Sequence, residues 1–214
     1  MILSPSILNV EDNKKVMYIK ELEKNGVTFL HLDVMDGKFV PNQTFDYEYI
    51  KTLRKESNMI FDTHLMIEEP ENLIEEYINS GSDYITFHIE ATKYPLEIIN
   101  KIKQHNKKVG ISIKPNTSVS EILKYLPLID LVLVMSVEPG FGGQSFMENS
   151  LPKINELKTL KETNNYSYLI EVDGGINNKT ASLVKEAGVE AIVVGSYLTK
   201  QENLEKAIYE LTNI

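Results

Sequence analysis

The chain has 214 residues, of which 42% are hydrophobic and 25% charged, a balance typical of a globular protein. Its net charge of -9 at pH 7 argues against nucleic-acid binding, because a phosphate backbone requires a basic surface. There are no cysteines, which excludes disulfides, thiolate metal ligands and a cysteine nucleophile.

Nothing in the sequence marks a domain boundary. No stretch has the composition of a linker, and no repeat or low-complexity tract interrupts the chain. We therefore expect residues 1–214 to form a single domain. Residues 1–8 lack a basic segment and are too short for a signal peptide or a membrane span, so we expect a cytoplasmic protein that does not enter membranes.

Short apolar runs alternate with amphipathic stretches along the whole chain. The apolar runs predict eight strands, at residues 2–8, 28–34, 59–66, 83–89, 108–113, 130–136, 168–173 and 190–195. Apolar residues at helical spacing predict helices at 15–24, 70–80, 95–105, 119–126, 150–162, 179–187 and 203–211. Gly26, Gly81 and Gly188 fall where helices are expected to stop.

This alternation predicts an α/β fold, a single (β/α)8 TIM barrel with a parallel eight-stranded core. A doubly wound open sheet is the alternative. A barrel places its chemistry at the carboxyl ends of the strands. Ser6 in the first predicted strand, Met135 in the sixth and Gly195 in the eighth all lie near such an end.

The second predicted strand carries a histidine and a carboxylate two residues apart, His31 and Asp33. Side chains at this spacing share one face of a strand. Polar groups on the inner face of a buried strand need partners, and a divalent cation accepts both nitrogen and oxygen ligands. The alternative is that His31 simply hydrogen-bonds Asp33 or a backbone carbonyl.

Two further strands end in the same way, with His64 on the third and Asp173 on the seventh. If these ends converge, two imidazoles and two carboxylates surround one cation and leave positions open for a substrate. This set, His31, Asp33, His64 and Asp173, accepts Zn, Fe, Mn or Co, so the sequence leaves the identity of the metal open.

Three loops rich in glycine follow the last three predicted strands, and phosphate sites in barrels often use the last two. Glycine lets the backbone approach an anion and direct its N–H groups toward it. The alternative is three tight turns. The residues concerned are Gly140, Phe141, Gly142, Gly143, Gly174, Gly175, Gly195 and Ser196.

Other residues near strand ends favour a supporting role. His88 and Glu90 repeat the histidine–carboxylate spacing on the fourth strand, and we interpret them as structural or as partners of a metal ligand. Met35, Met66 and Met135 lie beside the predicted site, where buried methionine is more often a filler of space.

Several motifs resemble those of the ribulose-phosphate 3-epimerase family, in order and over essentially the whole chain. They are residues 4–8 (SPSIL), 31–42 (HLDVMDGKFVPN), 62–66 (DTHLM), 134–144 (VMSVEPGFGGQ) and 172–176 (VDGGI). The resemblance implies a metal-dependent isomerase that interconverts D-ribulose 5-phosphate and D-xylulose 5-phosphate in the pentose phosphate pathway, as a homo-oligomer.

The resemblance also implies roles for individual residues. Asp33 and Asp173 would act as acid and base on opposite faces of a 2,3-enediolate, and both would bind the metal together with His31 and His64. Ser6 and His64 would contact the sugar, and residues 140–143 would cover it. The phosphate would be held by Gly174, Gly175, Gly195 and Ser196, and the reacting carbon lined by Met35, Met66 and Met135.

Two residues depart from the family pattern, Asp46 where glycine is common and Tyr197 where a small residue is common. Tyr197 could alter phosphate placement, and Asp46 could adjust its loop or cap the following helix.

Other functions compete with this interpretation. Epimerisation of D-allulose 6-phosphate needs the same ligands and a longer pocket. Barrel decarboxylases and synthases commonly carry an Asp-x-Lys-x-x-Asp array, but residues 33–36 (DVMD) contain no lysine. A non-catalytic sugar-phosphate sensor could discard a carboxylate, whereas all four ligands are present here.

Overall fold

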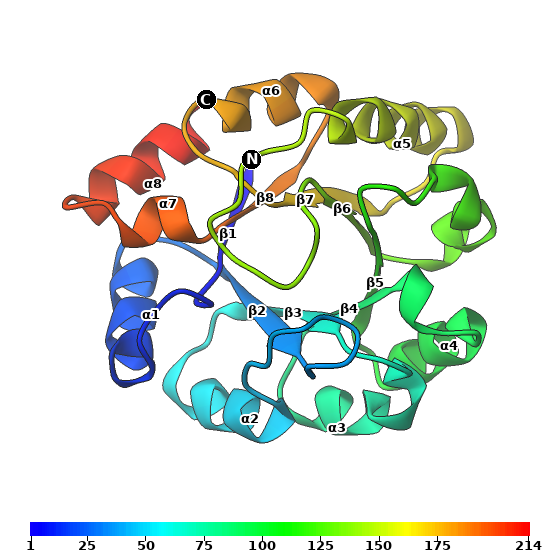
Figure 1. The fold of residues 1–214 in the computed structure, drawn as a ribbon, viewed down its shortest axis with the longest axis horizontal. Coiled ribbons are helices and arrows are strands. Elements are labelled where there is room, and N and C mark those ends of the chain that lie inside the picture. Colours follow the sequence, from blue (N-terminus) through cyan, green and yellow to red (C-terminus); the bar gives the residue numbers. More distant parts are fainter.

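Eight parallel strands form one sheet that curls into a ring, as the computed structural model of residues 1–214 shows (Figure 1). The strands follow each other around the ring in sequence order, and an isolated parallel bridge between Ser6 and His31 joins the first to the second. The strands are β1 (Ile2–Pro5), β2 (Phe29–Met35), β3 (Ile60–Met66), β4 (Tyr84–His88), β5 (Lys108–Ile113), β6 (Leu131–Met135), β7 (Leu169–Asp173) and β8 (Ala191–Val194). This arrangement confirms the predicted (β/α)8 TIM barrel.

The helices surround the ring of strands (Figure 1). They are α1 (Lys15–Lys24), α2 (Tyr47–Glu56), α3 (Ile74–Asn79), α4 (Pro95–Gln104), α5 (Ser150–Asn164), α6 (Thr180–Ala187), α7 (Ser196–Thr199) and α8 (Leu204–Thr212). Short 3-10 helices are η1 (Asp12–Lys14), η2 (Pro70–Asn72), η3 (Ile89–Ala91), η4 (Val119–Glu121) and η5 (Leu123–Leu128). None of the helices is long and apolar enough to cross a membrane.

Alternation along the strands separates two environments. On β2, Leu30, Leu32 and Val34 belong to the main core of 49 buried residues, which includes buried residues of the helices. His31 and Asp33 point the other way, toward residues of other strands inside the barrel. The period-two pattern that predicted this division is therefore confirmed.

Some predicted elements differ from the observed ones. The helix predicted at 119–126 is replaced by η4 and η5, and Pro127 inside η5 lacks the N–H that would continue an α-helix. The helix predicted at 70–80 begins as the 3-10 helix η2, and α3 covers only its second half. Helix α2 was not predicted, although it buries Ile50 and Leu53 and its Tyr47 and Tyr49 pack against the main core.

Four strands end earlier than predicted, and two of these ends precede candidate site residues. β1 ends at Pro5, so Ser6 follows the strand, and β8 ends at Val194, so Gly195 follows it as the residue preceding α7. Both residues still lie at the carboxyl end of their strand, where the barrel topology requires functional groups to be.

Asp46 caps helix α2. Its Oδ1 accepts hydrogen bonds from the backbone N–H groups of Glu48 at 3.0 Å and Tyr49 at 3.1 Å. These N–H groups lie in the first turn and have no partner within the helix. The departure from the family pattern at this position therefore stabilises a helix end, one of the two roles expected for it.

We predict that Asp46→Ala lowers the free energy of unfolding by about 1 kcal/mol, because it leaves these two N–H groups without their carboxylate partner. Urea unfolding measures the change. Asp46→Asn, which keeps an acceptor oxygen, should stay within a few tenths of a kcal/mol of the starting protein. An unchanged free energy of unfolding in Asp46→Ala would show that the cap contributes nothing.

Candidate active site

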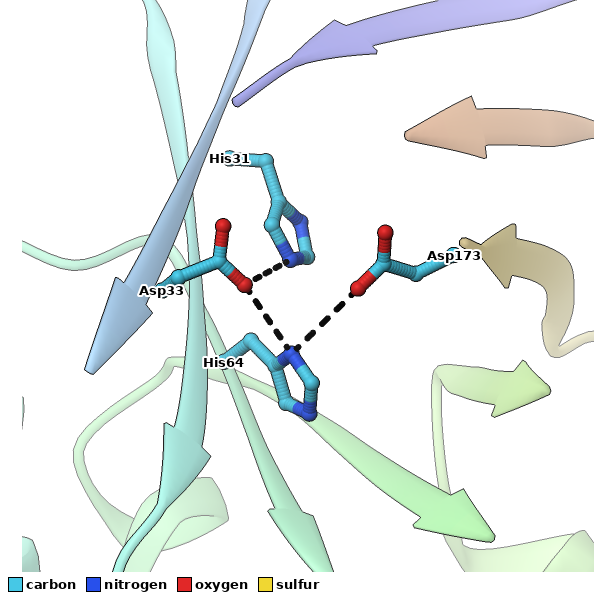
Figure 2. A group of neighbouring side chains, drawn as sticks. All are labelled: His31, Asp33, His64 and Asp173. Carbon is cyan, nitrogen blue, oxygen red and sulfur yellow. Dashed lines mark ion pairs between the residues drawn. The ribbon is translucent and has the colours of Figure 1, made fainter. Parts of the chain in front are cut away.

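Four side chains from three strands point toward one another at the carboxyl end of the barrel (Figure 2). Asp33 Oδ1 lies 3.4 Å from His31 Nε2 and 3.4 Å from His64 Nδ1. Asp173 Oδ2, from β7, lies 3.9 Å from His64 Nδ1. The four ligand-type atoms all lie within 4.8 Å of one another, so the predicted convergence of His31, Asp33, His64 and Asp173 is observed.

The distances fit shared coordination better than direct hydrogen bonding. Ligand bonds of 2.0–2.1 Å in a tetrahedral site place neighbouring ligand atoms about 3.3 Å apart, whereas N–H···O hydrogen bonds are about 2.9 Å long. His31 Nε2 and His64 Nδ1 are buried and have no hydrogen-bond partner. Buried nitrogens without partners are costly, and a cation between the four groups satisfies both of them. The cluster can therefore hold a metal ion.

The surroundings of the two carboxylates differ. Burial acts to raise the pKa of Asp33, but the positive charge of His31 and the proximity of His64 outweigh burial and hold this pKa well below its usual range. Burial and the Asp33 carboxylate raise the pKa of Asp173 to about 6. The site thus favours an ionised Asp33 beside an Asp173 that takes up a proton more readily.

Hydrogen bonds hold the Asp33 carboxylate and the backbone of both strand ends. The Ser6 hydroxyl donates to Asp33 Oδ2 at 2.5 Å, and the Thr44 hydroxyl donates to the Asp33 carbonyl at 2.7 Å. On the other side of the site, the Ser136 hydroxyl lies within hydrogen-bond distance of two carbonyl oxygens, that of Asp173 at 2.9 Å and that of Gly174 at 2.7 Å. The strand ends that carry the carboxylates are therefore held by neighbouring loops and strands.

A second group of ionisable side chains lies deeper in the barrel. His31 Nδ1 lies 2.6 Å from Asp62 Oδ2, and Glu171 is buried close to both. Burial acts to lower the pKa of His31, but the charges of Asp62 and Asp33 outweigh it and raise this pKa. Burial and the Asp62 carboxylate raise the pKa of Glu171 well above its usual range.

No role for Asp62 or Glu171 was predicted from the sequence. A signal for them exists, since Asp62 precedes His64 by two residues and Glu171 precedes Asp173 by two. The same spacing that joined His31 to Asp33 places each of them on the inner face of its strand.

A pocket of about 520 Å³ lies above the cluster. Its lining includes Asn9, Pro139 and all the predicted substrate residues except His64. Its wall includes Asp33 and Asp173, but His31 and His64 are fully buried behind it. The predicted contact between His64 and the sugar therefore stays a prediction. The other predicted residues in the wall are Ser6, Met35, Met66, Met135, Gly140, Phe141, Gly142, Gly143, Gly174, Gly175, Gly195 and Ser196.

The glycine loops after β6, β7 and β8 meet at one side of this pocket. Gly143 has φ +77°, and a Cβ on it would lie 3.9 Å from the Ser196 hydroxyl oxygen. Gly175 has φ +66°, and a Cβ on it would lie 2.3 Å from the backbone nitrogen of Phe146. Close packing between loops thus requires glycine at 175, whether or not the loops also bind an anion. The loop after β6 passes over the mouth of the barrel (Figure 1).

Tyr197, the second departure from the family pattern, lines the same pocket and packs against the main core. Burial, followed by the charge of Glu210, raises its pKa. The side chain therefore lies in the wall of the pocket, and its effect on phosphate placement stays a prediction.

We predict that Gly175→Ala destabilises the protein and raises KM several-fold, because the new methyl group displaces the backbone at Phe146. Chemical unfolding and steady-state kinetics measure the two effects. Gly26→Ala is the matched control, since Gly26 has φ +77° with nothing within 4 Å of the added Cβ. It should cost about 1 kcal/mol of backbone strain and leave KM unchanged. An unchanged KM in Gly175→Ala would contradict the prediction.

The fold and the site together define a class, a (β/α)8 barrel with a cluster of two imidazoles and two carboxylates below a glycine-rich pocket. Residues 2–199 match the Ribulose-phosphate 3 epimerase family. The chain belongs to this family, and it is an isomerase of the epimerase class, as the motif resemblance implied.

Curated relatives support the assignment over most of the chain. The chain is 42% identical over 194 residues to the ribulose-phosphate 3-epimerase of Treponema pallidum (strain Nichols), covering 91% of this chain and 89% of that protein. It is 41% identical over 210 residues to the ribulose-phosphate 3-epimerase of Bacillus subtilis (strain 168), covering 98% and 97%.

More distant proteins share the fold. A crystal structure of 3-hexulose-6-phosphate synthase covers 100% of this chain and 99% of its own, with a TM-score of 0.70 and 18% identity. A tryptophan synthase α-subunit from Pyrococcus furiosus, a mutant structure, covers 100% and 97%, with a TM-score of 0.72 and 14% identity. At these identities the likeness concerns the barrel alone.

Proposed function

We propose that the protein interconverts D-ribulose 5-phosphate and D-xylulose 5-phosphate, the step that the pentose phosphate pathway requires. The observation that carries the proposal is the placement of two carboxylates, Asp33 from β2 and Asp173 from β7, in the wall of one pocket. They approach the shared cluster from different sides of the barrel (Figure 2). Inversion at one carbon needs an acid and a base on opposite faces, which this arrangement supplies.

The proposed chemistry begins at C3 of the sugar, next to the C2 carbonyl. One aspartate removes the C3 proton, a 2,3-enediolate forms, and the other aspartate returns a proton to the opposite face. The two carboxylates are inequivalent, since the pKa of Asp33 is held low and that of Asp173 is raised to about 6, and we propose that one acts as the base and the other as the acid. The two exchange roles in the reverse direction.

A divalent cation would be held by His31, Asp33, His64 and Asp173. When bound, it supplies positive charge that favours loss of the C3 proton next to the carbonyl. The donor set suits Zn, Fe, Mn or Co. Ser6 keeps the Asp33 carboxylate oriented through its 2.5 Å hydrogen bond and also lies in the pocket wall, where it can contact the sugar.

The rest of the pocket suits the remainder of the substrate. Backbone N–H groups of Gly174, Gly175, Gly195 and Ser196 would hold the phosphate without cationic side chains, and residues 140–143 would exclude water from above. Met35, Met66 and Met135 offer apolar, polarisable surface near the carboxylates. We also propose that residues 1–214 act as one ribulose-phosphate-binding domain, since residues from Ser6 to Lys200 line a single pocket. The homo-oligomer and the cytoplasmic location stay predictions.

The experiment that tests this function compares D-ribulose 5-phosphate with D-allulose 6-phosphate in D₂O, using metal-loaded protein and NMR detection of deuterium at C3. We expect faster exchange and epimerisation of the pentulose phosphate. Preference for the hexulose phosphate would assign the sister epimerisation instead. Absence of exchange with both sugars would overturn enolisation and favour a non-catalytic sugar-phosphate-binding protein.

We predict that Asp33→Asn and Asp173→Asn each lower epimerisation at least about 100-fold, because each removes one acid–base group. The sharper expectation concerns exchange. Each variant should exchange the C3 hydrogen of only one of the two epimers, and the two variants should act on opposite epimers. Metal content measured on the same samples separates loss of the acid–base group from loss of the cation. Asp130→Asn, remote from the pocket, is the control. Exchange of both epimers by one variant would exclude a two-base mechanism.

A further inference from the structure

His88, at the end of β4, contacts the metal cluster without lining the pocket. Its Nε2 lies 2.8 Å from His64 Nε2, and its Nδ1 lies 3.2 Å from Glu90 Oε2. Glu90 Oε1 in turn accepts the backbone N–H of Lys114 at 2.8 Å. A continuous chain of hydrogen bonds therefore runs from the loop after β5 through Glu90 and His88 to His64.

These hydrogen bonds have only one donor-to-acceptor direction that is compatible with metal binding. Two ring nitrogens 2.8 Å apart share one proton, so one of them donates and the other accepts. His64 Nδ1 faces Asp33 and Asp173 and must carry no proton if it is to bind a cation. The proton of His64 then lies on Nε2 and is donated to His88 Nε2.

The same reasoning assigns the proton of His88. Its Nε2 is an acceptor, so a neutral His88 carries its proton on Nδ1 and donates it to the Glu90 carboxylate. A carboxylate can only accept, and the Lys114 N–H occupies its other oxygen. If these hydrogen bonds ran in the opposite direction, the proton of His64 would lie on Nδ1, where it would block the cation.

Packing keeps His88 in this orientation. The side chain is fully buried, the Phe39 ring lies 4.9 Å away between centroids, and the His64 ring lies 4.9 Å away on the same measure. The Lys114 ammonium lies 3.9 Å from the Phe39 ring centroid. The imidazole of His88 is thus buried and in contact with two other rings.

We propose that His88, supported by Glu90, is a positioning residue that selects the tautomer of His64 with its proton on Nε2 and so leaves Nδ1 free to bind the cation. The role resembles that of Asp62, which bonds the far nitrogen of His31 at 2.6 Å. It rests on the metal dependence in the proposed function. If His88 only filled space, any side chain of similar volume could replace it. The proposed role requires in addition a hydrogen-bond acceptor at the position of Nε2.

The test compares His88→Phe with His88→Gln. Phe fills the space and offers no acceptor, whereas the amide oxygen of Gln can replace Nε2 as the acceptor for His64. Zn²⁺ affinity is measured by competition with a chromophoric chelator, and the visible spectrum of the Co²⁺-loaded protein reports ligand geometry. Thermal unfolding of the metal-free variants shows that each one folds.

We expect His88→Phe to weaken Zn²⁺ binding about 10- to 100-fold and to alter the Co²⁺ spectrum. His88→Gln should bind Zn²⁺ within about threefold of the starting protein and keep its spectrum. Equal affinities and spectra in His88→Phe and the starting protein would overturn the role, and so would a Gln variant as weak as the Phe variant.

A second measurement keeps the proposal testable if the Phe variant does not fold. Imidazole ¹⁵N spectra of the Zn²⁺-loaded protein should show protons on His64 Nε2 and His88 Nδ1, and the opposite assignment would overturn it. Neither measurement depends on turnover, so a protein that positions His64 but epimerises no sugar contradicts only the proposed function. A protein that binds neither Zn²⁺ nor Co²⁺ contradicts both.

Discussion

The structure depends on packing four ionisable side chains, three of them buried, against one another at the carboxyl end of a parallel barrel. Burial removes water from His31 Nε2 and His64 Nδ1 without giving either nitrogen a hydrogen-bond partner. The cost of such burial is several kcal/mol for each polar group unless another partner replaces water. A cation is a partner that both nitrogens and both carboxylates can bind. The barrel that removes water from these groups therefore also forms the site that binds the cation.

The far nitrogen of each imidazole is satisfied inside the protein. His31 bonds Asp62, and His64 bonds His88. Fixing one nitrogen of each ring decides which way the other nitrogen points and whether it carries a proton. The interior of the barrel therefore holds two sets of polar side chains. One set could bind the cation, and the other, Asp62 and His88, forms hydrogen bonds to the two histidines of the first.

Much of this arrangement follows from two periodicities in the sequence. Alternation along β2 placed His31 and Asp33 together, and the rule that strand ends converge brought in His64 and Asp173. The contact of His88 with His64 could not be predicted in this way, because His64 pairs in register with Thr86, two residues before His88. Nor did spacing alone reveal that residues 119–126 form 3-10 turns and not an α-helix.

The difference between the two carboxylates arises from surroundings that spacing along a strand does not reveal. Asp33 receives the Ser6 hydroxyl and lies between two imidazoles, so its charge is stabilised despite burial. Asp173 lies near the Asp33 carboxylate and farther from His64, so burial and the neighbouring negative charge raise its pKa. Two aspartates of the same chemistry thus enter the site with unequal tendencies to hold a proton, which is the condition for one to remove a proton while the other supplies one.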